Sequence, residues 1–286
     1  MSANYQAEVV GVFGQPVAEN PTGVMQEAGF EAAGLNWRYL NFEVPPSRLG
    51  AAMQAMDALG MRGINLTIPH KVAVIEHLDE LSPEAQAIGA VNTVRIDGGK
   101  KIGENTDGKG FLRGLRNDAQ VDPVGKRVVM LGAGGAARAI GTELVLAGAS
   151  DLLVVNRSRE RGETMVADLR EATGGNVRFE RWLGTFKVRG ACDLLVNATS
   201  VGLYPDVDAM PDVALASLAD GTLVADAVFN PPETRLLAAA RTRGLPTLDG
   251  LSMLVYQGVI AFEMWTGQSP DEAAMKSALR AALAVG

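Results

Sequence analysis

Apolar and polar positions along the chain repeat in two alternating rhythms. Short apolar runs bounded by glycine, proline or asparagine predict buried β-strands. Between several of them, apolar residues recur at helical spacing, as in 47–59, where we expect Ser47 to cap the helix. The strand-like runs are 8–14, 37–42, 63–67, 90–96, 101–104, 127–131, 151–155, 192–197 and 222–226, and the helical stretches are 24–33, 47–59, 71–78, 253–265, 269–284 and a segment that runs from about 135 to 148.

This order of elements predicts an α/β fold with two domains. Asp97-Gly98-Gly99 separates two of the early strands and is typical of a hairpin turn. From Lys126 onward strands alternate with helices, the pattern of a parallel, doubly wound sheet. We therefore expect an N-terminal αβ domain at 1–108, joined by the C-terminal helices 253–286, and a Rossmann-type domain at 109–252. The join is placed inside a helix that starts at the Asp107 turn.

Composition excludes several classes of function. The 286 residues are 47% hydrophobic, and the net charge of −7 comes with dispersed basic residues, so nucleic acid and membrane are not expected partners. Cys192 is the only cysteine, which rules out an intrachain disulfide and favours a reducing compartment. The sequence has two histidines and no Cys/His cluster, which argues against a zinc site. It has no apolar run of eighteen residues, the length that a membrane-spanning helix needs. We expect a cytoplasmic protein without a metal site.

A glycine-rich turn follows the strand-like run 127–131. Gly132, Ala133, Gly134, Gly135 and Ala136 stand between that strand and a helix, the context of a dinucleotide-binding fingerprint. Backbone N–H groups at the start of such a helix bind a pyrophosphate. A purely structural turn is the alternative.

The end of the next strand bears on the choice between NAD and NADP. NAD sites usually carry a carboxylate there, whereas a 2′-phosphate requires cations. The chain has Asn156, Arg157, Ser158 and Arg161, with Arg159 and Glu160 between them. Arginine can bind a phosphate and stack on adenine, so NADP is favoured over NAD. A solvated basic helix start remains the alternative.

Two polar turns each place an ionisable side chain after a strand. Asn65-Leu66-Thr67-Ile68-Pro69-His70-Lys71 carries a lysine, and Gly103-Glu104-Asn105-Thr106-Asp107-Gly108 carries a carboxylate. A lysine, a carboxylate and a nucleotide turn, in this order, indicate hydride chemistry with a Lys71/Asp107 proton-transfer pair. The alternatives are a surface lysine at a helix start and an ordinary N-cap aspartate.

Five motifs, in order along the chain, resemble the shikimate dehydrogenase family: Asn65 to Lys71, Ala90-Val91-Asn92-Thr93, Asn105 to Phe111, Asn197 to Gly202 and Met253-Leu254-Val255-Tyr256-Gln257. The resemblance runs from about Val10 to Gly267. It implies an NADP-dependent oxidoreductase that interconverts shikimate and 3-dehydroshikimate, a reaction of aromatic amino acid biosynthesis. It also implies that Lys71 and Asp107 are the catalytic pair and face each other across the cleft between the domains.

The resemblance assigns further residues. It implies that 1–108 is the substrate-binding and catalytic domain and that 109–252 binds NADP. Thr67, Asn92 and Gln257 are implied to hold the ring hydroxyls of the substrate. Among the cofactor-binding residues it places Gly250 near the nicotinamide, and Thr199 and Ala227 in the same group.

The region implied to bind the substrate carboxylate departs from the family pattern. Family members have His-Ser-x-Ser-Pro with two serine hydroxyls on the carboxylate, whereas here Asn20 and Thr22 fall on the serine positions. Phe229 occupies the place of a tyrosine whose hydroxyl reaches the same carboxylate. The change is either neutral or marks a paralogue that acts on quinate, an aminoshikimate or another cyclic hydroxy acid.

Two further expectations follow. The partner is a small cyclic hydroxy acid, and a homodimer is an open alternative to the monomer. The alternative from a different functional class is a non-catalytic NADP-binding sensor on the same fold. The presence of both Lys71 and Asp107 argues against this alternative, because a sensor requires neither residue.

Overall fold

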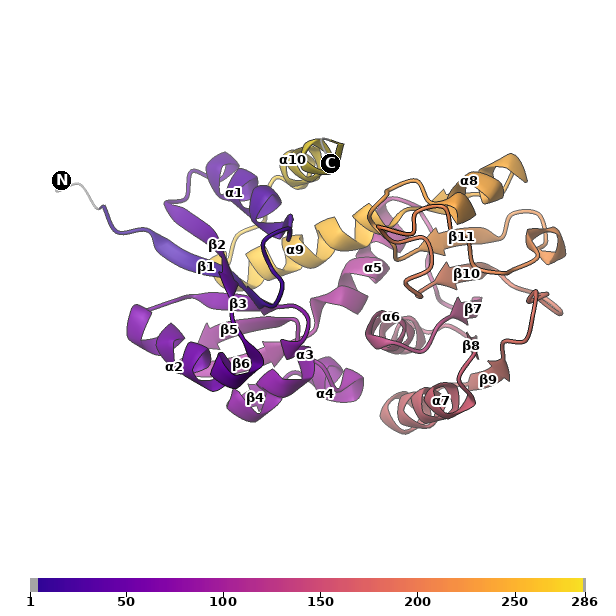
Figure 1. The fold of residues 1–286 in the computed structure, drawn as a ribbon, viewed down its shortest axis with the longest axis horizontal. Coiled ribbons are helices and arrows are strands. Elements are labelled where there is room, and N and C mark those ends of the chain that lie inside the picture. The colour runs from indigo at the N-terminus through magenta and orange to yellow at the C-terminus, as the bar shows by residue number, and fades with distance from the viewer. Residues whose placement is uncertain (1–4, 285–286) are drawn as a thin grey trace. The chain divides into compact units, whose positions relative to one another are not determined.

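The computed structural model describes residues 5–284 and divides into two compact units. One unit contains the chain up to Thr106 and again from Gln257, and the other contains Asp107–Tyr256. The division falls inside two helices, α5 (Thr106–Asn117) and α9 (Gly250–Thr266). Each unit has a six-stranded sheet, which confirms the α/β class (Figure 1).

The sheet of the first unit is mixed and has the order β2-β1-β3-β5-β6-β4. Its strands are β1 (Glu8–Gly14), β2 (Trp37–Glu43), β3 (Gly63–Leu66), β4 (Glu80–Leu81), β5 (Thr93–Asp97) and β6 (Lys100–Glu104). Strand β1 runs parallel to β2 and β3, whereas β5 is antiparallel to both β3 and β6. The predicted hairpin is confirmed: Gly98 and Gly99 join β5 to β6 with φ of 56° and 82°, which suits glycine at both positions.

Apolar residues cover both faces of this sheet because successive side chains of a strand point to opposite sides. Val10 and Val12 pack with Phe30 and Phe262, while Phe13 packs in a separate cluster with residues of α2. The helices of the unit are α1 (Thr22–Ala32), α2 (Leu49–Leu59), α3 (His70–Ala73), α4 (Pro83–Ile88), the later part of α9, and α10 (Glu272–Ala284).

Two local predictions in this unit are wrong. Ser47 does not cap α2, because it lies within a 3₁₀ turn, Pro46–Arg48, and Arg48 stands at the N-cap position without a side-chain hydrogen bond. The expected helix 71–78 is shorter, since α3 ends at Ala73 and Val74–His77 continues as a 3₁₀ helix. In the first case proline at the first position of the turn sets the start of the helical segment.

The sheet of the second unit is parallel throughout, in the order β12-β11-β10-β7-β8-β9. Counted from β7, this is the strand order of a Rossmann fold. Such folds bind their ligands beyond the carboxyl ends of the strands, at the point where the strand order reverses. In this sheet the order reverses between β7 and β10. The strands are β7 (Arg127–Leu131), β8 (Asp151–Asn156), β9 (Val177–Arg181), β10 (Leu194–Asn197), β11 (Leu223–Asp226) and β12 (Thr247–Leu248), and the helices are α5, α6 (Gly135–Leu146), α7 (Arg159–Thr173), α8 (Arg235–Thr242) and the start of α9.

Both faces of the parallel sheet are buried. Val128 and Met130 pack in one cluster, and Val129 and Leu131 pack in another with Cys192. Burial raises the pKa of the Cys192 thiol to about 11, so it is a neutral packing residue at ordinary pH. Within residues 5–284, no helix is both long enough and apolar enough to cross a membrane.

Candidate active site

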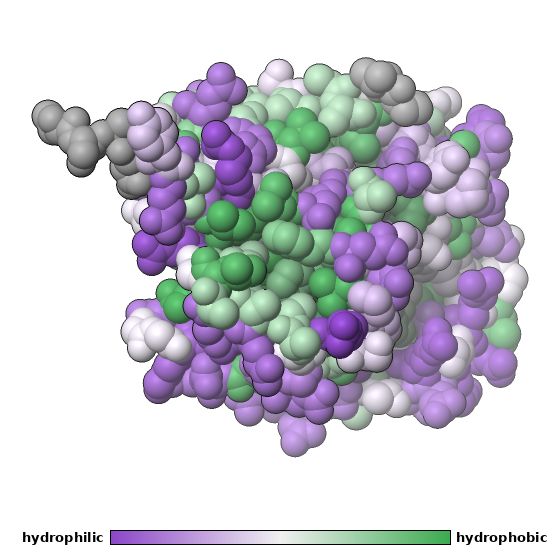
Figure 2. Space-filling model, turned by 60° about the vertical axis from the view of Figure 1, so that its left-hand side comes forward, coloured by the Kyte–Doolittle hydropathy of each residue, from purple (hydrophilic) through white to green (hydrophobic). Residues whose placement is uncertain are grey.

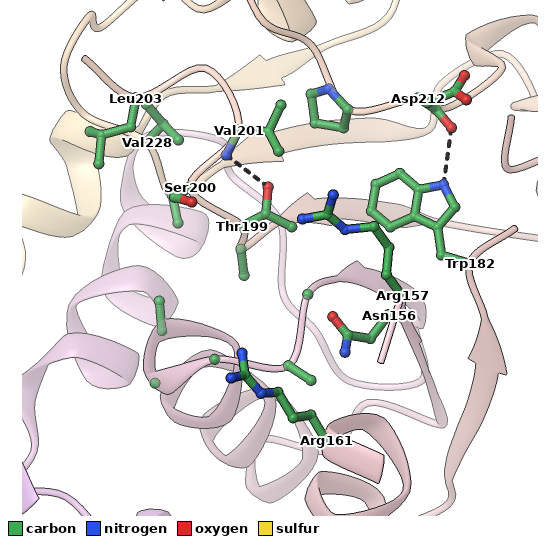
Figure 3. A pocket seen from close by; sticks show the side chains of 18 of the residues that line it. Asn156, Arg157, Arg161, Trp182, Thr199, Ser200, Val201, Leu203, Asp212 and Val228 are labelled. Atoms are coloured by element: carbon green, nitrogen blue, oxygen red, sulfur yellow. Dashed lines mark hydrogen bonds between the residues drawn. The ribbon is translucent and has the colours of Figure 1, made fainter. Parts of the chain in front are cut away.

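A pocket of about 800 Å³ lies at the carboxyl ends of the strands of the second unit. Loops that follow β7, β8, β10 and β11 contribute most of its lining (Figure 3). The lining residues are Gly132, Ala133, Gly134, Gly135, Ala136, Asn156, Arg157, Arg161, Trp182, Gly184, Ala198, Thr199, Ser200, Val201, Leu203, Met210, Pro211, Asp212, Ala227, Val228 and Phe229. The position matches the crevice where Rossmann folds bind their ligands.

The glycine turn after β7 is shaped for close approach of a ligand. Gly132 has a φ of 114°, and a Cβ there would lie 2.8 Å from the Ala198 carbonyl oxygen. A Cβ at Gly134 or Gly135 would project into open space, and α6 begins at Gly135 without a side-chain cap. The first N–H groups of a helix have no intrahelical partner. The turn therefore fits the pyrophosphate of a dinucleotide.

The end of β8 presents cations to the same pocket. Asn156, Arg157 and Arg161 line it, and Glu160 is not among the lining residues. Ser158 caps α7, since its hydroxyl accepts a hydrogen bond from the Arg161 N–H at 3.3 Å. The Asn156 side-chain amide donates to the Ser158 carbonyl at 2.9 Å, which fixes the turn. Two guanidinium groups beside the strand end fit the 2′-phosphate of NADP.

Asp226 links two walls of the pocket. One of its oxygens accepts from the Asn197 side-chain amide at 2.9 Å and the Val228 N–H at 3.0 Å, and the other accepts from the Thr234 hydroxyl at 2.7 Å. The Asn197 oxygen in turn accepts from the Thr199 hydroxyl at 2.7 Å. Burial raises the pKa of Asp226 to about 6, although these hydrogen bonds act in the opposite direction.

Several predicted site residues of the second unit lie beside Val228, either in its own loop or at the start of α9. Gly250 begins α9, and a Cβ there would clash with the Val228 carbonyl oxygen, so only glycine lets the helix start this close to the loop. Phe229 lines the pocket together with Ala227. The loop after β11 therefore brings a predicted cofactor residue and a predicted substrate residue to one cavity.

In the first unit, Thr67 lies in the loop after β3, and Lys71 lies in the short helix α3 that follows this loop. The Thr67 N–H donates to the Phe13 carbonyl at 3.0 Å, and the Lys71 carbonyl accepts from the Val91 N–H at 2.7 Å. His70 between them is fully buried, and its Nε2 lies 2.7 Å from the Val44 carbonyl oxygen. The backbone of this loop is thus fixed at several points, which gives the half-buried Lys71 a defined place.

Asn92 belongs to a buried hydrogen-bond network in the same unit. Its Nδ2 donates to the Thr106 hydroxyl at 3.0 Å, and its Oδ1 accepts from the Thr106 N–H at 2.7 Å. Asn65 donates to the Thr93 hydroxyl at 2.9 Å and accepts from the buried Tyr39 hydroxyl at 2.8 Å. This network fixes Thr106, the first residue of α5, and Asp107 follows directly in the chain.

The remaining predicted substrate residues also lie in the first unit. The Asn20 side-chain oxygen accepts from the Thr22 N–H at 3.0 Å, at the start of α1. Thr22 and Gln257 are both buried, with 6% and 7% of their surface exposed. Lys71 also belongs to this unit, whereas Asp107 is the first residue of the other.

Sequence reasoning missed several pocket residues, above all Trp182. It follows β9, a strand that was not predicted, and the alternation of Val177 and Phe179 with polar residues was the signal that could have located it. No group of three or more potential metal-ligating side chains (His, Cys, Asp or Glu) comes together within the described residues.

Three family models match the chain. Residues 12–94 match the shikimate dehydrogenase substrate binding domain, 117–202 match shikimate / quinate 5-dehydrogenase, and 250–280 match the shikimate 5′-dehydrogenase C-terminal domain.

The chain is also similar to individual proteins along nearly its whole length. It is 44% identical to the shikimate dehydrogenase (NADP(+)) of Methanopyrus kandleri, covering 98% of this chain and 97% of that one. The ligand-free structure of 5-ketofructose reductase from Gluconobacter sp. strain CHM43 is 47% identical, covers 97% and 99% of the two chains and has a TM-score of 0.93. For shikimate 5-dehydrogenase from Thermus thermophilus in complex with NADP(H) and shikimate, the identity is 38%, the coverage 96% and 100%, and the TM-score 0.84.

Proposed function

The chain belongs to the shikimate dehydrogenase family, and we propose from this membership and from the geometry above how its residues carry out the reaction. The reaction is the NADP-dependent interconversion of shikimate and 3-dehydroshikimate. The observation that carries this conclusion is the similarity to shikimate dehydrogenases over nearly the whole chain. The pocket supports it, because its glycine turn and two arginines fit NADP.

NADP supplies the acceptor or donor of the hydride. We assign the pyrophosphate to the turn Gly132–Ala136 and the 2′-phosphate to Asn156, Arg157 and Arg161, with Ser158 holding that turn in place. Thr199, Ala227 and Gly250 complete the cofactor site on the loops after β10, after β11 and at the start of α9.

Lys71 and Asp107 are the proposed proton-transfer pair. Lys71 takes the proton from the hydroxyl oxygen as the ring carbon becomes a carbonyl, and returns it in the reverse direction. Asp107 orients the lysine and favours its charged form after the proton arrives. The backbone bonds that fix the loop at Thr67 and Lys71 support this role, because a proton-transfer group must be positioned.

Substrate binding is assigned to the first unit and to Phe229. Thr67, Asn92 and Gln257 hold the ring hydroxyls, and Asn20 and Thr22 face the carboxylate. Asn20 uses its amide oxygen to accept from the Thr22 N–H, so its Nδ2 is the group that can donate to an anion. Domain roles follow: residues 1–108 with 253–286 bind substrate, and 109–252 bind NADP.

The test of the proton-transfer pair is Lys71→Ala beside a matched control. We expect turnover to fall by roughly 10²–10⁴, the usual contribution of a positioned acid or base, with the Kd for NADP unchanged. Lys100→Ala removes a lysine of the same unit that is 61% exposed and pairs with Glu80, and it should keep wild-type turnover. Near-wild-type turnover in Lys71→Ala would remove this residue from the mechanism.

A second candidate function is the reduction of a keto sugar. The relative at 47% identity is a 5-ketofructose reductase, and a sugar has no carboxylate. One feature of this chain favours the candidate, because Phe229 has no hydroxyl to donate to a carboxylate. Rates of NADPH oxidation with 5-ketofructose and with 3-dehydroshikimate separate the two functions. A higher kcat/KM for 5-ketofructose would favour the second.

Two properties of the whole protein complete the proposal. A homodimer is supported by β2, an edge strand that leaves Leu40 45% exposed, and by apolar surface on the face of the first unit (Figure 2). Light scattering across a concentration series tests for the dimer, and a constant monomer mass would contradict it.

The proposed cytoplasmic location rests on the family, and fractionation of the source cells tests this location.

A further inference from the structure

An arginine among the cofactor residues assigned above can stack on the adenine as well as bind a phosphate, but the base has a second face that also needs a partner. We infer that Trp182 provides it, with the indole forming the aromatic wall of the pocket against which the adenine packs in both NAD and NADP. This inference rests on the proposed cofactor site and adds a residue that determines how tightly the base is bound.

The place of Trp182 in the sheet is the first observation. In a Rossmann fold, the adenosine lies beyond the carboxyl end of the second strand, which is β8 here. Strand β9 pairs in parallel with β8, and the Trp182 N–H donates to the Asn156 carbonyl at 3.0 Å. Trp182 is thereby fixed beside the turn that carries the proposed 2′-phosphate residues.

The orientation of the indole is the second observation. Its Nε1–H donates to the Asp212 carbonyl at 3.2 Å, and its six-membered ring lies toward Arg157 (Figure 3). Trp182 is partly buried and packs against the core cluster that contains Phe186 and Val213. Because the only polar group of the ring already has a partner, the surface that it offers to the pocket is apolar. Such a surface suits a flat base and does not suit a phosphate.

The contrast with the two arginines makes the role specific. Arg157 and Arg161 are exposed cations that line the same pocket, and a cation discriminates NADP from NAD through the 2′-phosphate. The indole is uncharged and would contact a base that both cofactors share. Loss of Trp182 should therefore weaken both cofactors by one common factor, whereas loss of Arg157 should weaken NADP far more than NAD.

The experiment compares Trp182→Leu with Trp182→Phe, two variants that both keep apolar packing against the core. Calorimetry gives the Kd of each for adenosine 2′,5′-bisphosphate, NADP and NAD. Trp182→Leu should weaken all three roughly tenfold, the usual scale of one base–aromatic contact, while Trp182→Phe stays within about threefold of wild type. Equal affinities in Trp182→Leu and wild type, or equal losses in the two variants, would overturn the inference.

Fluorescence gives an independent readout. Trp37 and Trp265 lie in the first unit, so Trp182 is the only tryptophan of the second. Adenosine 2′,5′-bisphosphate should quench the emission of the wild type and of a Trp37→Phe control, and the quenching should be absent from Trp182→Phe. Retained quenching in Trp182→Phe would count against the contact. If instead the 2′-phosphate assignment fails, wild-type NADP and NAD will bind alike while the Trp182 result stands.

Discussion

Asp226→Asn replaces a buried carboxyl that titrates in an accessible pH range. Asp226 is 1% exposed, and burial raises its pKa from 3.8 to about 6 against the hydrogen bonds from Thr234, Val228 and Asn197. The folded protein therefore binds this proton more tightly than the unfolded chain does. The stability that comes from protonation is fully present below pH 3.8, the pKa of the carboxyl in the unfolded chain. It is lost as the pH rises through about 6, the pKa in the folded protein.

The size of the effect follows from the two pKa values. A difference of about two pKa units corresponds to about 3 kcal/mol between the acidic and basic limits. Between about pH 8 and about pH 5, roughly 1.4 kcal/mol of this is gained. Asparagine does not titrate. On lowering the pH from about 8 to about 5, the free energy of unfolding of the wild type should therefore rise by that amount relative to that of Asp226→Asn.

Urea denaturation of both proteins across this pH range measures the shift. Asp220→Asn is the matched control, because the Asp220 side chain is 90% exposed, and its difference from wild type should change far less with pH. A wild-type-minus-Asp226→Asn difference that stays flat from about pH 8 to about pH 5 would refute the reasoning. The carboxyl would then have the same pKa in the folded and unfolded states.

Two further substitutions test the cofactor and substrate assignments. Arg157→Ala should weaken NADP by a few kcal/mol at most and barely change NAD, since only NADP offers a 2′-phosphate; an unchanged NADP/NAD ratio of Kd values would make Arg157 a surface residue. Phe229→Tyr, alone or with Asn20→Ser, should raise kcat/KM for shikimate about tenfold, the equivalent of one hydrogen bond, mainly through a lower KM. An unchanged or lower kcat/KM in both variants would mean that the carboxylate is held elsewhere.

The features of the fold that were predictable from sequence are those set by local patterns. The strand Glu8–Gly14 and the strand Arg127–Leu131 have the predicted limits, because a buried strand requires an apolar run and its turn requires glycine. The hairpin at Gly98 and Gly99 was predictable for the same reason. Helix starts were less so: Ser47 has the right chemistry for a cap, yet the turn that begins at Pro46 determines where the helix begins.

The site residues that could be predicted from the sequence are likewise those that belong to local patterns. Gly132, Arg157 and Thr199 were found because each belongs to a short motif, and the structure gathers them in one pocket. Trp182 was missed because β9 was not predicted; the alternation at Val177 and Phe179 indicates a strand there, but it does not show that this strand lies beside β8. Asp226 was not singled out either, since its pKa arises from burial and from partners as far away in sequence as Asn197.

The central claim is that this chain oxidises shikimate with NADP, and its most direct test is the initial rate at which the purified protein forms NADPH from NADP or NADH from NAD. Shikimate, quinate and a neutral cyclic polyol are each supplied with NADP and, in parallel, with NAD. We expect shikimate with NADP to have the highest kcat/KM of the six combinations. A folded protein that binds NADP but forms no NADPH from shikimate would contradict the claim.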